Sequence, residues 1–241
     1  MNEFHHLWAG FSASPLLHLT LTLIAYQAGV YLSERTHHHP LANPVLIAIV
    51  VLTIVLMTTG TDYKIYFQGA QFVHFLLGPA TVALAIPLYR AYDRIRRSAA
   101  AIAAAIISGC VFAIVSTVGI GWALGASRAT LLSLAPKSAT TPIAMGVSSM
   151  IGGDASLTAI FVILTGILGA VVSTWLLDLV RVKDARARGL AAGLVAHGIG
   201  TARKFQVDEL TGAFAGLAMG LNGIATALLV PLLMHWLGFI P

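Results

Sequence analysis

The chain has 241 residues, of which 58% are hydrophobic and 10% are charged. Soluble domains carry about 25% charged residues, so this composition excludes an ordinary soluble protein and predicts an all-α polytopic membrane protein. The formal net charge of +5 arises from basic residues in short loops beside apolar runs, which does not indicate nucleic-acid binding.

The apolar runs between charged residues predict about six transmembrane helices, since a crossing helix needs about 20 predominantly apolar residues. In chain order we expect these helices at 14–33, 43–60, 66–89, 98–122, 156–180 and 209–238. Residues 1–97 should form a scaffold and oligomerisation part, and residues 98–241 a transport-like core.

Two features stand out in the N-terminal part. The first is a histidine-rich segment, THHHP (36–40), which together with His5 and His6 suggests a metal site. Consecutive histidines lack the spacing that metal sites use, so we expect a polar loop and no metal. Gly78 and Pro79 lie inside the third predicted helix, where the proline removes a backbone hydrogen bond and predicts a kink.

Two further segments, 127–151 and 189–204, are apolar but broken by Pro, Gly and polar residues. The basic loops at 90–97 and 181–188 should both be cytoplasmic under the positive-inside rule. Each broken segment would then begin and end on one side of the membrane. We therefore expect two re-entrant segments, the first from outside and the second from the cytoplasm. The alternative is that they cross as discontinuous helices, which gives seven to eight spans.

A short internal repeat follows the two breaks. LTAIFVILTGILGAV (157–171) resembles LTGAFAGLAMGLNGI (210–224), and one inserted residue aligns Gly166 with Gly220. If each break is re-entrant, the two copies have opposite orientations. Inverted repeats whose broken helices meet near the midplane occur in many secondary transporters, so we predict an inverted repeat here.

The first break, PKSATTPIAMG, contains Lys137, which is the only charged residue between Arg128 and Asp154. An ionisable side chain at membrane depth is a functional-site hypothesis by default. The alternative is a loop at the membrane surface whose lysine extends to the lipid headgroups. Ser138 adds a hydroxyl next to the lysine.

A helix should begin near Pro142 in the same break, because proline suits the first helical turn. Thr140 or Thr141 is placed to cap it. Free N–H groups at such a helix start bind carboxylates. We therefore count these three residues with Lys137 as candidate substrate-binding residues.

The second break, HGIGTARK, offers a comparable set. His197 can hold or release a proton near neutral pH, Gly198 and Gly200 allow close approach of the backbone, and Thr201 can cap a helix. A histidine on an apolar helix also serves for packing alone, and that alternative stays open. Asn222 lies deep in the last predicted helix, where it either bonds across helices or faces a transport path.

No phosphate-binding Gly-rich loop, HExxH motif, nucleophile elbow or pair of catalytic carboxylates occurs in the sequence. We therefore expect neither an enzyme nor a cofactor.

Four segments of the chain resemble the LrgB/CidB family of bacterial inner-membrane proteins. They are PKSATTPIAMGVSSMIGG, HGIGTAR, GAFAGLAMGLNGIATALLVPLL and the upstream FLLGPATVALAIPLY. That family was described as holin/antiholin-like modulators of murein hydrolase activity and autolysis. A related plastid glycolate/glycerate carrier joins an LrgA-like half to an LrgB-like half, and bacterial relatives are implicated in pyruvate movement. The His-rich loop and Lys204, where relatives often carry a small residue, depart from the pattern.

The resemblance implies two functions. The first is ion-coupled transport of small monocarboxylates such as pyruvate, glycolate or glycerate. Lys137 and the helix start at Pro142 would hold the carboxylate, hydroxyls including Thr201 would bind the other oxygen, and His197 would carry a coupling proton. The alternative is a holin/antiholin-like protein acting with an LrgA-type partner. Either would be a multi-pass inner-membrane protein, expected to form a homodimer.

Overall fold

The computed structural model describes residues 14–36, 42–83 and 85–240, and every regular element in these ranges is an α-helix. The chain divides into two compact units, Met1–Ala83 and Leu84–Pro241. The predicted His-rich loop and both N-terminal histidines lie outside the described residues, except for Thr36.

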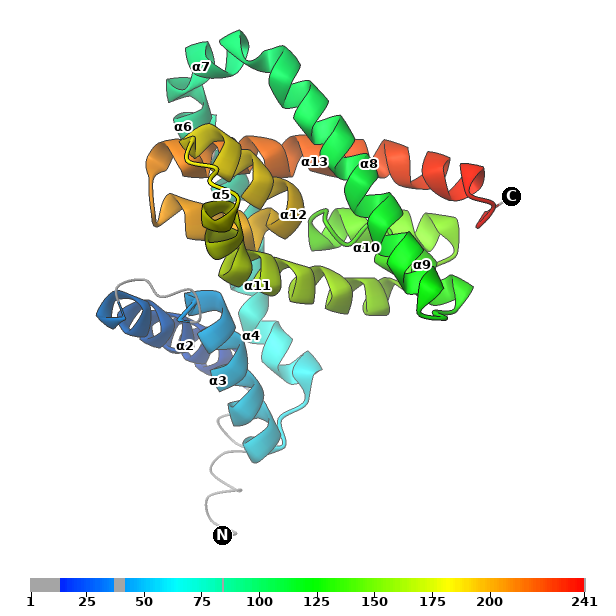
Figure 1. Cartoon of the computed structure of the whole chain (residues 1–241). Helices are drawn as coiled ribbons and strands as arrows, with labels where there is room; N and C mark the ends of the chain where they lie inside the picture. Colours follow the sequence, from blue (N-terminus) through cyan, green and yellow to red (C-terminus); the bar gives the residue numbers. More distant parts are fainter. Residues whose placement is uncertain (1–13, 37–41, 84, 241) are drawn as a thin grey trace. The chain divides into compact units, whose positions relative to one another are not determined.

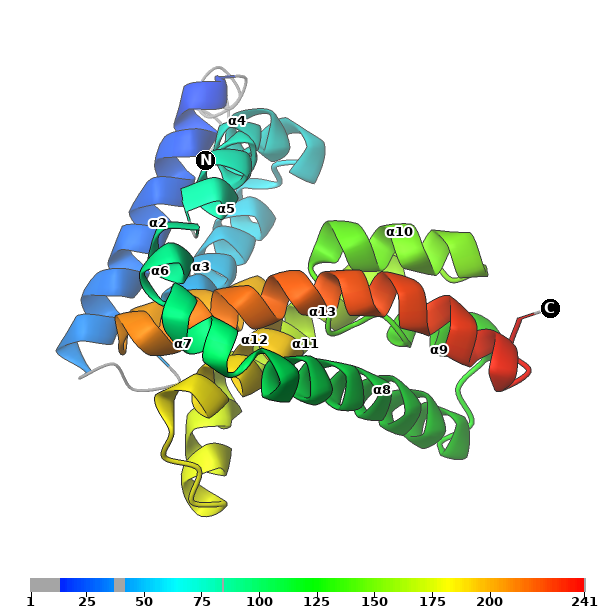
Figure 2. The same cartoon turned by 90° about the horizontal axis from the view of Figure 1, so that it is seen from above.

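The first unit contains α2 (Pro15–Arg35), α3 (Pro44–Thr59), α4 (Tyr63–Phe75) and α5 (Leu77–Ala83). The second contains α6 (Ala85–Arg90), α7 (Tyr92–Arg97), α8 (Ala99–Ala123), α9 (Arg128–Leu134), α10 (Thr141–Ile151), α11 (Ala155–Leu179), α12 (Ala185–Phe205) and α13 (Glu209–Trp236). Figure 1 and Figure 2 show the helices from two directions.

Five stretches of the described residues are long and apolar enough to cross a membrane. They are Pro15–Arg35, Tyr63–Arg90, Ala99–Ala123, Ala155–Leu179 and Glu209–Trp236. The predicted span at 43–60 corresponds to α3, an apolar helix of 16 residues. The composition and these helices together make the chain a polytopic helical membrane protein, as predicted.

The interruption expected near Pro79 is present. α4 ends at Phe75 and α5 begins at Leu77. Pro79 lacks the N–H that would bond to the Phe75 carbonyl, and its ring crowds that carbonyl. The helix is therefore broken within the four residues that precede the proline.

In the first unit, α2 packs against α3 and α4. The start of α3 is fixed by Asn43, whose side chain accepts hydrogen bonds from the Val45 N–H at 2.9 Å and the Leu46 N–H at 3.3 Å. Between α2 and α4, the Thr22 and Tyr66 hydroxyls lie 2.9 Å apart. This unit therefore has its own helix–helix contacts.

Aspartates cap the three long helical elements at the C-terminal end of the chain. Asp154 accepts from the Leu157 N–H at 2.6 Å, and Asp208 accepts from the Thr211 N–H at 2.8 Å. Asp184 caps α12, and the hydrogen bond from the Arg186 guanidinium lowers the pKa of Asp184 to about 2. These caps fix where each helix begins.

In the second unit, α8 packs against α13 and α12, and α11 packs against α12 and α10 (Figure 1, Figure 2). One buried cluster joins α8 to α9, α10 and α13 and includes Ile114, Leu132, Val147 and Val230. The broken segments between the long helices therefore pack against α8, α11 and α13.

Candidate functional site: the tips of two helical hairpins

The segment from α9 to α10 folds back on itself, and we call residues 128–151 the first hairpin. Its ends are held together beside α9. The Asp154 N–H donates to Ser133 Oγ at 2.8 Å, and Thr158 Oγ1 lies 2.7 Å from Ser148 Oγ and 3.1 Å from the Ser133 carbonyl oxygen. The chain thus returns to α9 before α11 begins, and the re-entrant topology in the membrane stays a prediction.

α12 is a second hairpin, which comprises residues 185–205. The backbone angles of His197, φ 39° and ψ −130°, are not those of a helix, and the chain reverses direction at this residue. Before the turn, Gly193 packs against the backbone of Ala215. After the turn, Phe205 packs against Gly212, so the second arm runs back along α13. The sequence predicted close backbone approach at Gly198 and Gly200. The turn itself is at His197.

Asn222, in the middle of α13, joins the two hairpin tips. Its Nδ2 donates to the Ser138 carbonyl at 3.0 Å and to the Leu194 carbonyl at 3.1 Å. In a continuous helix, the Leu194 carbonyl would accept from the Gly198 N–H. The turn at His197 removes that partner, and the asparagine replaces it. The bonding role considered for Asn222 is therefore present, and it connects both breaks.

One acceptor of Asn222 remains. The side chain is 1% exposed, and Oδ1 has no hydrogen-bond partner within the described ranges. Buried polar atoms are nearly always hydrogen-bonded. The two tips thus meet at a point where a polar acceptor is still available.

His197 is held at the turn by α11. Its Nε2 lies 2.9 Å from the Val162 carbonyl oxygen, so Nε2 carries a proton and donates it. The Val162 side chain packs with Ala139 and Ala144 of the first hairpin. Val162 therefore contacts one hairpin through its side chain and the other through its carbonyl. A non-glycine residue at positive φ is strained, and this hydrogen bond helps to hold it there.

The His197 ring occupies the space beside Gly166. A Cβ at position 166 would lie 2.6 Å from His197 Cε1 and 2.7 Å from Nε2, whereas a Cβ at Gly220 would meet nothing within 4 Å. These are the two glycines that the internal repeat aligns. Their surroundings differ, so they form a matched pair for mutation.

We expect Gly166→Ala to displace the His197 ring and break its hydrogen bond to Val162. Overpacking of this kind costs about 1–3 kcal/mol, which should appear as a lower unfolding temperature of the purified protein. Gly220→Ala adds the same methyl group in open space, and alanine favours a helix over glycine by about 0.5–1 kcal/mol. Equal unfolding temperatures for the two variants would contradict the placement of His197.

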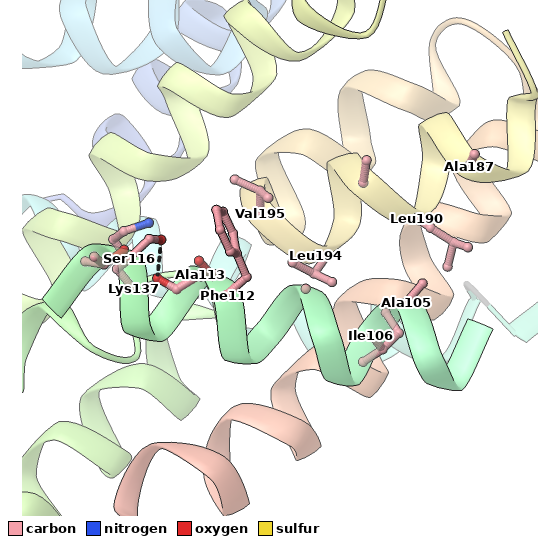
Figure 3. A pocket seen from close by; sticks show the side chains of 14 residues that line it. Ala105, Ile106, Phe112, Ala113, Ser116, Lys137, Ala187, Leu190, Leu194 and Val195 are labelled. Atoms are coloured by element: carbon pink, nitrogen blue, oxygen red, sulfur yellow. Dashed lines mark hydrogen bonds between the residues drawn. The ribbon is translucent and has the colours of Figure 1, made fainter. Parts of the chain in front are cut away.

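A cavity of about 520 Å³ lies between α8, the tip of the first hairpin and the first arm of α12. It is lined by Ala105, Ile106, Gly109, Phe112, Ala113, Ser116, Thr117, Lys137, Ser138, Ala187, Leu190, Ala191, Leu194 and Val195. Figure 3 shows Lys137 beside Ser116 at one end of this cavity. The hydroxyl residues of α8, Ser116 and Thr117, were missed from the sequence; their signal was an adjacent Ser-Thr pair inside an apolar run.

The Lys137 side chain is half-buried, and its ammonium makes no hydrogen bond or ion pair with any residue that the structure describes. It is close enough to His197 for an electrostatic interaction. A cation in apolar surroundings is costly unless it is paired. The cavity therefore offers a positive charge to a ligand.

The other candidate residues occupy different places. Thr140 is at the N-cap position of α10, but its side chain makes no cap hydrogen bond. Thr141 and Pro142 open α10 and do not line the cavity. Thr201 Oγ1 donates to the His197 carbonyl at 2.7 Å within its own helix turn.

The two glycines of the second break also differ. Gly198 is exposed, whereas Gly200 is buried and packs against the Ala192 carbonyl. Among the described residues, no group of three or more His, Cys, Asp or Glu side chains could hold a metal ion. The structure thus places Lys137 and Ser138 in the wall of the cavity. The Ser138 carbonyl also accepts a hydrogen bond from Asn222.

The fold and this site define a polytopic membrane protein in which two helical hairpins meet between long helices. The sequence model of the LrgB-like family matches residues 22–236, and the chain belongs to that family. No solved structure matches the chain.

Three relatives illustrate the likeness. The chain is 32% identical to the holin-like protein CidB of Staphylococcus epidermidis, over 91% of this chain and 95% of the relative. It is 35% identical to the uncharacterized protein YwbG of Bacillus subtilis, over 92% and 98%. It is 31% identical to the antiholin-like protein LrgB of Bacillus mycoides, over 93% and 98%. Together with the apolar helices, these matches make it a multi-pass bacterial membrane protein.

Proposed function

We propose that the chain is a secondary transporter of small monocarboxylates such as pyruvate, glycolate or glycerate. The observation that carries this proposal is the unpaired Lys137 ammonium in a cavity at the tip of a broken helical segment. A carboxylate would supply the missing counter-charge, and the Ser116 and Ser138 side chains could bind its second oxygen or its keto or hydroxyl group.

The hairpin geometry also supports transport. Both tips end near the middle of α13, where Asn222 binds them. Broken helices that meet between long helices provide binding sites in many transporters, and movement of one part against another then alternates access. A coupling proton on His197 would occupy Nδ1, since Nε2 already faces the Val162 carbonyl.

The test is uptake of labelled acid by proteoliposomes that contain the purified chain. Saturable uptake that is inhibited by the unlabelled acid supports the proposal. Uptake that rises linearly with concentration, at the rate of empty liposomes, contradicts it.

A second candidate is a holin/antiholin-like role with an LrgA-type partner, and the names of the relatives CidB and LrgB favour it. The transport function and the holin/antiholin-like function can be distinguished by measuring lysis and acid uptake in the same strain. If Lys137→Ala stops uptake and also removes the effect on lysis, the effect on lysis follows from acid flux. If lysis control persists without uptake, the second role stands by itself.

The re-entrant topology makes a prediction of its own. Single cysteines at positions 94, 137 and 186 would be introduced after the native Cys110 is replaced by serine. We expect a membrane-impermeant thiol reagent to label positions 94 and 186 from one side, and position 137 from the other. Labelling of 94 and 186 from opposite sides would favour the discontinuous-crossing alternative.

A further inference from the structure

The cavity beside Lys137 has two chemically different ends. Lys137 and Ser116 provide a charge and a hydroxyl at one end, and their sequence neighbours Ser138 and Thr117 also line the cavity. The rest of the wall is apolar and includes Ala105, Ile106, Gly109, Ala187, Leu190 and Leu194. Figure 3 shows Ala105, Ile106 and Ala187 at the end opposite Lys137.

The cavity is also larger than a three-carbon acid. Pyruvate fills roughly 180 Å³ if each non-hydrogen atom takes about 30 Å³, the volume of a water molecule in the liquid. The cavity measures about 520 Å³. A three-carbon acid bound at Lys137 would therefore leave most of the apolar wall uncovered.

From these two observations we infer that the site binds 2-oxo or 2-hydroxy monocarboxylates with longer aliphatic chains more tightly than three-carbon acids. This inference rests on the proposed function. The carboxylate pairs with Lys137, and the aliphatic chain lies along Ile106, Leu190 and Leu194. Dicarboxylates and polyhydroxy acids longer than glycerate are disfavoured, because the apolar end offers no partner to a second charge or to further hydroxyls.

The experiment is calorimetric titration of the purified full chain with pyruvate and with 4-methyl-2-oxopentanoate, which has three more carbons. Burial of one methylene improves binding about fourfold. The cavity is partly open, so we expect the larger acid to bind about tenfold or more tightly than pyruvate. Equal affinities would overturn the inference.

Filling the apolar end tests where the chain lies. Ala105 is exposed and lines the cavity, whereas its exposed neighbour Ala104 does not. Ala105→Leu should remove most of the gain for the larger acid and leave pyruvate binding unchanged, and Ala187→Leu on the facing helix should do the same. Ala104→Leu is the matched control and should change neither affinity. A persistent preference in both filled variants would contradict the inference.

The remaining outcomes separate this inference from the proposed function. If pyruvate binding depends on Lys137 and the larger acid binds no better, the transport proposal stands and the inference fails. If neither acid binds and native mass spectrometry finds a phospholipid that is lost in Lys137→Ala, the cavity is a lipid site. Both the proposed function and the inference are then overturned.

Discussion

Replacement of Lys137 by alanine should abolish saturable carboxylate uptake while leaving the protein folded. The ammonium lines the cavity and has no partner within the described part of the chain, so its removal breaks no internal bond. A bound carboxylate, by contrast, would lose its counter-charge. Loss of one member of a buried charge pair costs about 2–5 kcal/mol, which corresponds to about 30-fold or more in apparent affinity.

The controls for this variant separate charge from position. Lys183→Ala removes an exposed lysine from the loop between α11 and α12 and should leave uptake unchanged. Lys137→Arg keeps the charge and should retain part of the uptake. The unfolding temperatures of Lys183→Ala and Lys137→Arg should match that of the parent chain, and that of Lys137→Ala should be no lower, because an unpaired cation is removed. Undiminished uptake by Lys137→Ala would remove this residue from the site.

Replacement of Asn222 by alanine should instead lower both stability and uptake. The change leaves the Ser138 and Leu194 carbonyls without the donors that they now share. An unsatisfied buried polar group costs about 1–3 kcal/mol, so two of them should destabilise the protein by about 2–6 kcal/mol. Since both tips lose their common contact, the cavity beside Ser138 should also lose its shape.

Thr226→Ala is the matched control on the same helix. Thr226 is also buried, and among the described residues its hydroxyl has one hydrogen-bond partner, the weak Cys110 Sγ at 3.6 Å. Its loss should cost about 1 kcal/mol. If Asn222→Ala and Thr226→Ala unfold at the same temperature, Asn222 does not hold the tips together. Asn222→Asp keeps the oxygen, loses both amide donors and buries a carboxyl group, so it should unfold at or below the temperature of the alanine variant.

Much of the fold follows from local sequence features. Long runs without charge mark the membrane helices, because charges are costly in lipid. Pro79 marks the interruption after α4, and Asp154 marks the start of α11. α3 is shorter than its predicted span because Pro44 and Gly60 bound it closely, with Gly60 at φ 65° ending the helix. Such features act within a few residues, so they can be read from the chain.

The candidate site was only partly predictable. Lys137 and Ser138 were singled out because a charged and polar break in apolar sequence is unusual, and both line the cavity. Thr140 and Thr141 looked equally suitable, yet neither lines it. Ser116 and Thr117 were missed because α8 is almost entirely apolar, with Ser108 as its one other hydroxyl residue. Which hydroxyls face the cavity depends on how α8 is rotated against the first hairpin.

The sequence by itself determined the class of protein, the membrane helices and the two breaks, because hydropathy and proline chemistry act locally. Only the tertiary structure decided that the turn of the second break lies at His197 and that Asn222 bonds to both tips. The physical reason is that carbonyls freed by a break must find donors elsewhere. For Ser138 and Leu194, that donor lies far away in the sequence, on α13.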